Sequence, residues 1–298
     1  MAASTSLTLT RSRVSAYVAL TKPRIIELLL VTTLPTMVVA ARGLPPVWLM
    51  AATLLGGTLA AAGANVVNMY VDRDIDAIMR RTRGRPLVTG ELEPHQALVF
   101  AVALEALAFV ELWFLVNPLS AVLALSATLF YVFVYTLWLK RTSTQNIVIG
   151  GAAGAVPVLV GWAAVTGSLG LAPVVLFAVI FLWTPPHFWA LAIRYREDYA
   201  AADVPMLPAV APLRVTARRV MGYTLALWAC SLLFAAVGDM GLLYLGAAVV
   251  LGAVFVFQAW RLQRDGSAQR AMRLFSYSIT YVTLLFSAMA LDQLLGLR

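Results

Sequence analysis

The feature that most constrains this chain is a series of apolar runs, each about 20 residues long, separated by polar connections. A run of that length, wound as an α-helix, crosses the hydrocarbon core of a bilayer. Only 12% of the 298 residues are charged, whereas about 25% is typical of a soluble domain. The fold class is therefore all-α: a polytopic membrane protein whose helices surround a central cavity. Nine transmembrane helices are expected, at residues 25–41, 48–69, 97–116, 119–138, 146–165, 171–192, 219–237, 240–260 and 274–294.

The basic residues predict how these helices are oriented. Among 22 Lys and Arg residues, only Arg42 and Arg298 fall outside the segments that would share a side with the N-terminus. Cytosolic segments of membrane proteins carry the excess of Lys and Arg, so we expect the N-terminus in the cytosol and the C-terminus outside. The net charge of +8 then reflects topology, and no nucleic-acid partner is expected. Residues 1–20 are expected to be a cytosolic N-terminal tail, disordered over residues 1–16, and residues 21–298 a single transmembrane domain.

The most polar stretch, residues 68–86, follows the second expected span. Asn68, Asp72 and Asp76 are spaced four residues apart, so in a helix they share one face at about 6 Å of rise each. Asp74 points away from that face. Mg²⁺ is usually held by one or two carboxylates together with substrate phosphates. The arginines of the same stretch attract anions, and they are Arg73, Arg80, Arg81, Arg83 and Arg85. This combination predicts a site that handles a diphosphate.

A second charged stretch follows the sixth expected span. It contains Arg194, Glu197 and Asp198, with Asp203 five residues further on and off their helical face. Two acidic segments could hold one diphosphate between them through metal ions, which neutralise charge on the leaving oxygens. Ordinary solvated surface charges are the alternative.

His187 lies inside the sixth apolar run, after Pro185 and Pro186. The two prolines are expected to break the helix there, which a membrane protein tolerates beside a cavity or within its core. An ionisable residue at that depth is a candidate to bind a metal, a haem iron or a substrate. A buried histidine whose hydrogen bonds are satisfied is the alternative.

Three glutamates in or beside the apolar runs are compatible with a different class of function, that of a transporter. Glu27, Glu105 and Glu111 are residues that a proton-coupled transporter would need. A transporter's key carboxylates should lie near the bilayer midplane at broken helices. The best acidic stripe here lies at the end of a span beside arginines, which favours an enzyme.

The Asn-x-x-x-Asp-x-x-x-Asp stripe after the second span resembles the intramembrane aromatic prenyltransferases of the UbiA type. The resemblance covers about residues 20–210, and the segments that carry it are 21–24, 68–86, 139–142, 146–162, 183–188 and 198–208. Pro186-His187-Phe188 and the Val-Pro-Met-Leu-Pro run at 204–208 point to the branch that modifies haem. Many members carry a second Asp-x-x-x-Asp motif, and this chain lacks that spacing.

The resemblance implies a Mg²⁺-dependent transfer of farnesyl from farnesyl diphosphate to a vinyl group of haem B, giving haem O. It assigns catalysis and metal binding to Asn68, Asp72, Asp76 and Asp198. Substrate binding falls to Lys22, Arg24, Arg81, Arg85, Lys140, Arg141, His187, Arg194 and Glu197. The expected location is a bacterial cytoplasmic (inner) membrane with the site on the cytosolic side. Membrane lipid and a downstream haem-modifying enzyme are expected partners, and a quinone precursor or a chlorin remains an alternative acceptor.

Overall fold

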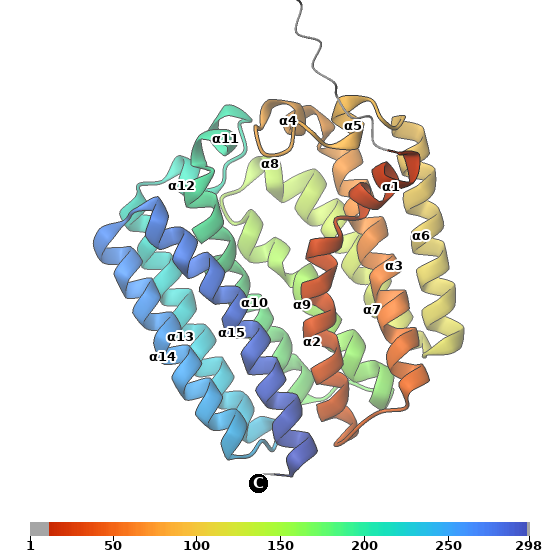
Figure 1. Ribbon diagram of the computed structural model, residues 1–298, viewed down its shortest axis with the longest axis vertical. Coiled ribbons are helices and arrows are strands. Elements are labelled where there is room, and N and C mark those ends of the chain that lie inside the picture. The colour runs from red at the N-terminus through yellow and green to blue at the C-terminus, as the bar shows by residue number, and fades with distance from the viewer. Residues whose placement is uncertain (1–11, 297–298) are drawn as a thin grey trace, which may run out of the picture.

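The computed structural model describes residues 12–296, and the side chains of residues 24, 25 and 27–30 lie outside that description. Within the described residues every regular element is a helix, which confirms the all-α class. The long helices run side by side as one bundle (Figure 1). They are α2 (Pro23–Ala41), α3 (Val47–Val71), α6 (Pro94–Leu115), α7 (Pro118–Leu129), α9 (Asn146–Thr166), α10 (Leu171–Arg194), α13 (Leu213–Val237), α14 (Leu242–Asp265) and α15 (Ala268–Leu295).

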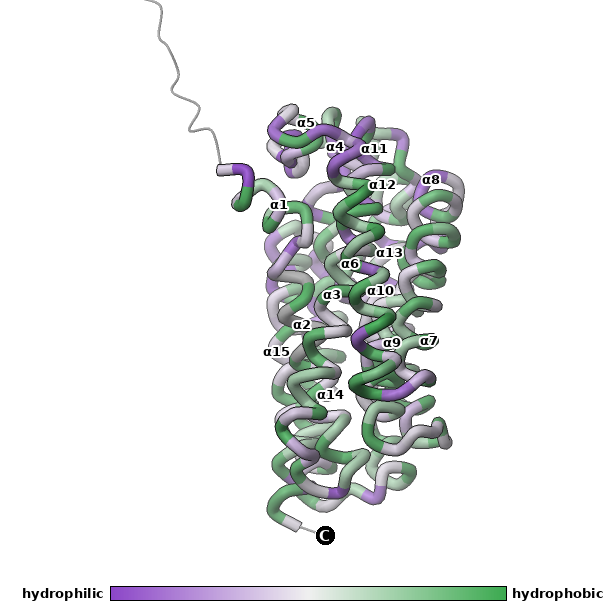
Figure 2. Tube along the Cα trace, turned by 90° about the vertical axis from the view of Figure 1, so that its right-hand side faces the viewer, coloured by the Kyte–Doolittle hydropathy of each residue, from purple (hydrophilic) through white to green (hydrophobic). Residues whose placement is uncertain are grey.

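Eight helices in the described part of the chain are long and apolar enough to cross a membrane, and they coincide with eight of the expected spans. One of them, Pro118–Thr142, joins α7 to a π-helix, η1 (Phe130–Leu139), and to α8 (Lys140–Thr142). The first expected span corresponds to α2, whose apolar part Val31–Ala41 is shorter. Figure 2 shows hydrophobic residues along the bundle and hydrophilic ones gathered at one end.

Short helices fill the two polar connections that the sequence marked as important. They are α4 (Arg73–Ile78) and α5 (Pro86–Thr89) after α3, and α11 (Arg196–Ala201) and α12 (Leu207–Val210) after α10. All four lie at the same end of the bundle (Figure 1). The two charged stretches, which are more than 100 residues apart in the sequence, therefore share one face of the molecule.

The expected break in α10 is wrong. This helix continues through Pro185 and Pro186, both of which are buried. Proline removes a backbone donor, but α10 packs against α9, α13 and α15, and this surrounding contact keeps the helix regular. Trp189, fully buried on α10, shows how deeply the helix lies in the bundle.

The expectation of disorder is wrong for residues 13–16, which belong to a helix. Helix α1 (Arg13–Thr21) begins after Ser12, whose side chain accepts a hydrogen bond from the backbone of Ser15. Ala16 and Leu20 are buried in an apolar cluster with residues of α3 and α6. These apolar residues lie four apart and form one face of a helix, which packs onto the bundle. The remainder of the expected tail, residues 1–11, lies outside the described residues.

Candidate active site

The predicted stripe keeps its helical register across the junction of α3 and α4. The backbone N–H of Asp72 bonds the carbonyl of Asn68 at 3.0 Å, and that of Asp76 bonds the carbonyl of Asp72 at 2.8 Å. The i to i+4 pattern of an α-helix therefore continues through Asp72. All three residues are buried, at 3%, 0% and 2% exposure. The polar face that the spacing predicted exists, and it points into the protein.

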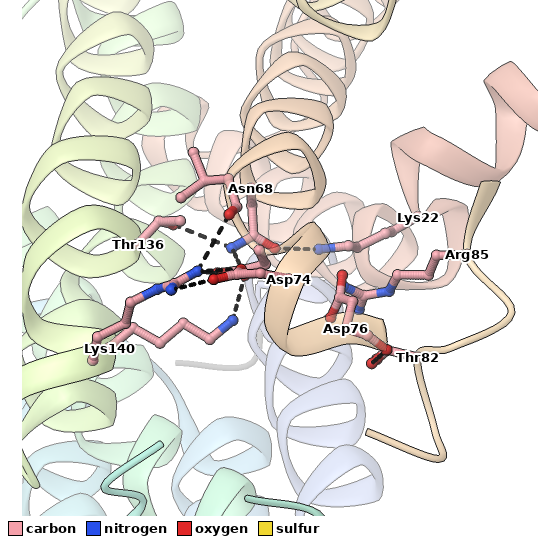
Figure 3. Close-up of polar contacts among 11 residues, drawn as sticks. Lys22, Asn68, Asp74, Asp76, Thr82, Arg85, Thr136 and Lys140 are labelled. Atoms are coloured by element: carbon pink, nitrogen blue, oxygen red, sulfur yellow. Dashed lines mark hydrogen bonds and ion pairs between the residues drawn. The ribbon is translucent and has the colours of Figure 1, made fainter. Parts of the chain in front are cut away.

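Asn68 is the centre of a hydrogen-bond network at this face (Figure 3). Its amide nitrogen donates to Asp72 Oδ2 at 2.7 Å and to Thr136 Oγ1 at 3.2 Å. Its side-chain oxygen Oδ1 accepts a hydrogen bond from Lys22 Nζ at 2.7 Å. The network joins three segments that are distant in sequence, because Lys22 precedes α2 and Thr136 belongs to η1.

Each aspartate of the first stretch has its own cation. Lys140 pairs with Asp72, and Arg85 pairs with Asp76. The guanidinium of Arg141 binds both carboxylate oxygens of Asp74, at 2.6 and 2.7 Å. Such forked pairs are strong and directional.

The Asp74 side chain is 60% exposed, as expected for a residue off the buried face. Its hydrogen bonds with Arg141 lower its pKa to about 2. The structure thus separates one exposed aspartate from the two buried ones.

Positive charge is concentrated around the buried carboxylates. Burial lowers the pKa of the Lys22 ammonium well below its ordinary value, and the neighbouring charges of Arg85 and Lys140 lower it further. Burial is the largest cause of this shift, but the two neighbouring cations show that Lys22, Arg85 and Lys140 lie close enough to repel one another. An anion placed here would relieve that repulsion, so the geometry suits a diphosphate.

The π-helix η1 was not anticipated from the sequence. It ends at Leu139, immediately before Lys140 and Arg141, the two cations that reach Asp72 and Asp74. π-Helical turns are rare and occur frequently at functional sites. The apolar run 119–138 gave no sign of it.

The second charged stretch reaches the first through Asp198. Its Oδ2 accepts a hydrogen bond from the backbone N–H of Arg81 at 3.3 Å. The Arg81 guanidinium lies 5.8 Å from the ring centre of Tyr195. Burial raises the pKa of the Tyr199 hydroxyl, although Arg81 opposes that change. The structure therefore brings the two acidic segments together.

Among the predicted site residues with described side chains, Arg194, Glu197 and His187 are not brought into this cluster. Glu197 and Arg194 are exposed, and no hydrogen bond or ion pair joins either of them to the residues listed above. The side chain of Arg24 lies outside the described side chains.

His187 is held between α10 and α15. Its ring stacks on Trp183 and Phe275, with ring centres 4.2 and 4.6 Å away. Its Nδ1 lies 2.7 Å from Ser278 Oγ, which donates to the carbonyl of Phe275 at 2.6 Å. Because that hydroxyl proton is already used, Nδ1 carries the proton of the neutral imidazole and Nε2 is the acceptor. The histidine is buried and hydrogen-bonded, with one nitrogen left available to a ligand.

Asn146 is a further candidate site residue, which the sequence patterns did not single out. It is the first residue of α9, it is 0% exposed, and neither amide atom has a hydrogen-bond partner. One turn further on the same face is Gly150, where the absence of a Cβ leaves room for the Tyr135 ring of η1. Asn146 thus lies on the η1 side of α9, near the level of Lys140. The available signal was an amide that opens an apolar run a few residues after Lys140 and Arg141.

The transporter-type glutamates lie elsewhere. Glu105 accepts a hydrogen bond from Thr128 at 3.1 Å, and a Cβ on Gly63 of α3 would meet its side chain. Both carboxylate oxygens of Glu111 are buried without a partner beside Gly56 of α3. Both glutamates therefore lie at the interface of α3 and α6. The side chain of Glu27 lies outside the described side chains.

The residues present fit Mg²⁺ only together with a phosphate ligand. In the described residues, no three His, Cys, Asp or Glu side chains lie close enough to hold a metal ion by themselves. Asp72 Oδ1, however, is buried without a hydrogen-bond partner, with Arg141 3.8 Å away. Mg²⁺ is commonly bound by one or two carboxylates plus substrate phosphates rather than by an all-protein cage. The donors Asn68, Asp72 and Asp76 match that pattern.

The sequence profile of the UbiA prenyltransferase family matches residues 29–286. The chain belongs to the UbiA prenyltransferase family. The family resemblance inferred from residues 20–210 is confirmed, and the match extends into α15.

Curated relatives within this family include two proteins named protoheme IX farnesyltransferase. The one from Parafrankia sp. (strain EAN1pec) is 57% identical over 286 residues, covering 95% of this chain and 91% of the relative. The one from Frankia alni (strain DSM 45986 / CECT 9034 / ACN14a) is 55% identical over 282 residues, covering 94% and 98%. The predicted likeness to the haem-modifying branch is confirmed.

Solved UbiA-type structures share the fold at lower identity. A structure of digeranylgeranylglyceryl phosphate synthase has a TM-score of 0.78 and 17% identity, over 94% of this chain and 98% of that one. A UbiA homologue from Archaeoglobus fulgidus bound to GPP and Mg²⁺ has a TM-score of 0.60 and 16% identity, over 92% and 99%. The helical bundle is thus the UbiA prenyltransferase fold.

Proposed function

We propose that this protein transfers the farnesyl group of farnesyl diphosphate to a vinyl group of haem B, giving haem O and diphosphate. The observation that carries the proposal is the 57% identity, over nearly the whole of both chains, with a relative named protoheme IX farnesyltransferase. The buried acidic stripe and its cations supply chemistry that this reaction needs.

Diphosphate binding falls to the cluster around Asp72. Arg85 and Lys140 exchange their carboxylate partners for phosphate oxygens, while Arg81 closes over the diphosphate from the side of Asp198. Asn68, Asp72, Asp76 and Asp198 would hold Mg²⁺, which the Archaeoglobus homologue binds together with GPP. When bound, the ion neutralises charge that develops on the leaving diphosphate. The proposal rests on the convergence of buried acids and cations at one face.

Asn146 orients the same group. A buried amide without partners is costly, at about 1–3 kcal/mol for each unsatisfied atom, and both of its polar atoms are in that state. A diphosphate oxygen accepts from its Nδ2, and a water or a cation faces its Oδ1. Lys22 donates a hydrogen bond to the side-chain oxygen Oδ1 of Asn68 and so fixes the orientation of that side chain for binding.

The chemical step breaks the bond between C1 of the farnesyl group and the diphosphate oxygen, and the bond electrons leave with the diphosphate. The π electrons of the haem vinyl group then form the new carbon–carbon bond to C1. Water adds to the carbocation left on the vinyl carbon and loses a proton, which leaves a hydroxyl group there. The apolar bundle keeps other water from the allylic cation, because its interior is lined by hydrophobic residues.

Haem binding is assigned to the α10 side of the bundle. His187 presents Nε2 to the haem, and basic residues near α2 such as Lys22 and Arg24 meet the propionates. Arg194 and Glu197, exposed at the end of α10 and the start of α11, contribute at the entrance. The product then passes within the lipid to a haem-modifying enzyme.

The topology completes the proposal. α2 is the first of nine membrane spans in a single domain, residues 21–298. The bias of Lys and Arg places the N-terminus and the active face in the cytosol, with the C-terminus outside, in a bacterial inner membrane. The accumulation of hydrophilic residues at one end of the bundle supports this orientation (Figure 2).

The decisive experiment is the mass of the haem made by cells that express this chain. A haem B-producing host that lacks its own prenyltransferase should accumulate haem O, which is heavier than haem B by one farnesyl group plus one hydroxyl group. The same host carrying Asp72→Ala, expressed to the same level, should retain haem B. Haem B alone in both strains, while labelled farnesyl is transferred to a quinone precursor, would reject haem as the acceptor.

A further inference from the structure

A cleft lined by arginines lies away from the candidate active site, where α13 begins and α14 ends. It encloses about 500 Å³, and its lining includes Leu213, Arg214, Arg218, Trp260, Arg264 and Asp265. It lies at the end of the bundle that carries α11 and α12, on the opposite side from α3 and α6 (Figure 1). In a helix that crosses a bilayer, the polar end of the span is at the level of the lipid headgroups.

The charge of this cleft is not balanced within the described protein. Asp265 is its only acid, and that carboxylate accepts from Arg270 Nε at 3.0 Å and from Ser267 Oγ at 3.1 Å. The three lining arginines, Arg214, Arg218 and Arg264, form no ion pair with any described residue. The cleft therefore offers guanidinium groups to an anion, and phosphate oxygens match their forked geometry.

An exposed apolar stripe leads along α14 to these arginines. Val250, Val254 and Phe257 follow helical spacing and are 61%, 37% and 51% exposed. Arg261 lies over the Phe257 ring at 5.6 Å. Arg264 lies over Trp260 at 5.2 Å, and Trp260 is itself 45% exposed. Aromatic residues of this kind mark the interfacial level of a membrane protein.

We propose that this cleft is a binding site for an anionic phospholipid. The phosphodiester lies between Arg214, Arg218 and Arg264, and one acyl chain lies along the apolar stripe of α14. The three arginines lie at the level of the headgroups and match the phosphate of such a lipid. The apolar stripe of α14 continues into the hydrocarbon and matches its acyl chain. Basic pockets between membrane helices bind anionic headgroups by the same chemistry.

The chain offers a matched pair of variants to test this proposal. Arg218 and Arg219 are neighbours on α13 and both are exposed, but only Arg218 lines the cleft. Arg218→Gln and Arg219→Gln remove the same charge from the same helix. Purified protein is titrated with dioleoyl phosphatidylglycerol or dioleoyl phosphatidylcholine in neutral detergent, and bound lipid is counted by native mass spectrometry.

Phosphatidylglycerol should bind more tightly than phosphatidylcholine, and Arg218→Gln should weaken its binding about fivefold, the effect of one basic residue near a membrane surface. Arg219→Gln should leave the affinity within about twofold, because an exposed charge outside the cleft contributes little. The triple variant Arg214→Gln/Arg218→Gln/Arg264→Gln should bind the two lipids alike. In phosphatidylcholine, Arg218→Gln should keep the melting temperature and the prenyl transfer of the unchanged protein.

Three outcomes would overturn the proposal. Equal losses of phosphatidylglycerol affinity in Arg218→Gln and Arg219→Gln would show that general surface charge, and not the cleft, attracts the lipid. Equal binding of both lipids by the unchanged protein would show that the headgroup is not recognised. Displacement of the lipid by 10 mM inorganic phosphate would identify a site for a free anion instead of a lipid.

Discussion

Burial distinguishes the aspartates of the first charged stretch from one another. Asp72 is 0% exposed and Asp76 2%, whereas the Asp74 side chain is 60% exposed. All three have a cationic partner, so pairing alone does not identify the functional ones. A buried carboxylate costs free energy unless its environment compensates the charge, and Asp72 and Asp76 are retained in the interior at that cost.

Asp72→Asn should therefore reduce prenyl transfer by at least about a thousandfold, since a metal ligand supplies several kcal/mol of transition-state stabilisation. Asp74→Asn is the control, because it makes the same change two residues away on the exposed side. It should lower kcat/KM by less than about threefold. Initial rates with labelled farnesyl diphosphate, at matched melting temperatures, make the comparison. Full activity of Asp72→Asn would remove it from the metal site.

Asp74 should also make stability depend on pH. Its pKa is lowered to about 2 in the folded protein, below the ordinary value of about 3.9 in an unfolded chain. The contribution of the ionised Asp74 carboxylate to the free energy of unfolding is therefore complete above about pH 4 and is lost as the pH falls toward 2. Because the pair is exposed, it is worth about 0.5 kcal/mol. The difference in unfolding free energy between the unchanged protein and Asp74→Asn should be constant from pH 5 to 7, disappear near pH 2, and shrink in high salt. A difference that persists at pH 2 contradicts this account.

His187→Ala should weaken haem binding and alter the Soret band, because it removes the nitrogen that faces the haem in the proposed function. Ser278→Ala keeps the imidazole but removes the hydroxyl that lies 2.7 Å from Nδ1. It should shift the Soret band less and weaken haem binding by a smaller factor, about tenfold at most. An unchanged spectrum and affinity in His187→Ala would leave the histidine as a packing residue between α10 and α15.

Helices were predictable where the spacing of residues in the sequence repeats with the period of a helix. They were not predictable where packing against other helices decides the backbone geometry. The Asn68–Asp72–Asp76 spacing anticipated a shared face, because four-residue spacing has one meaning in a helix. The π-helix η1 and the continuity of α10 through its prolines depend on packing with other helices, which a single sequence does not display. The apolar face of α1 was overlooked in the same way, since nine residues with two Arg nearby resembled a tail.

Glycines on α9 allow a direct test of element packing. A Cβ on Gly151 would meet the Thr184 side chain of α10 at 2.8 Å, whereas nothing lies within 4 Å of a Cβ on Gly154. Gly151→Leu should destabilise the protein by about 1–3 kcal/mol through overpacking, and Gly154→Leu should change little. Melting temperatures in detergent compare the two variants. Similar melting temperatures would mean that α9 and α10 separate at little cost.

The whole bundle concentrates chemistry at one end. Segments after α3, η1 and α10 supply the acids and cations, and their convergence was foreseeable because each was expected on the same side of the membrane. The contacts that join them were not foreseeable: the Arg81–Asp198 hydrogen bond spans 117 residues. Asn146 shows the same limit, since an amide at the start of an apolar run is a weak signal, and its burial without partners is visible only in the structure.

The orientation can be measured with single cysteines, because Cys230 is the only native one. In a Cys230→Ser background, Arg83→Cys places a thiol in the active-face connection, and Ser168→Cys places one between α9 and α10. Both positions are exposed. A membrane-impermeant maleimide should label residue 168 in spheroplasts and residue 83 only in inverted vesicles. The reverse pattern would invert the proposed topology.

The contact between Lys22 and Asn68 has a practical consequence for anyone who expresses this protein. The end of α1 is tied to α3 twice, since Asn65 of α3 also donates to the backbone carbonyl of Thr21 at 3.1 Å. Trimming the chain to the start of α2, which the sequence pattern invites, would cut away a support of the diphosphate cluster. Affinity tags and fusion partners should therefore be attached beyond α15, and an inactive preparation truncated near residue 22 would say nothing about the enzyme.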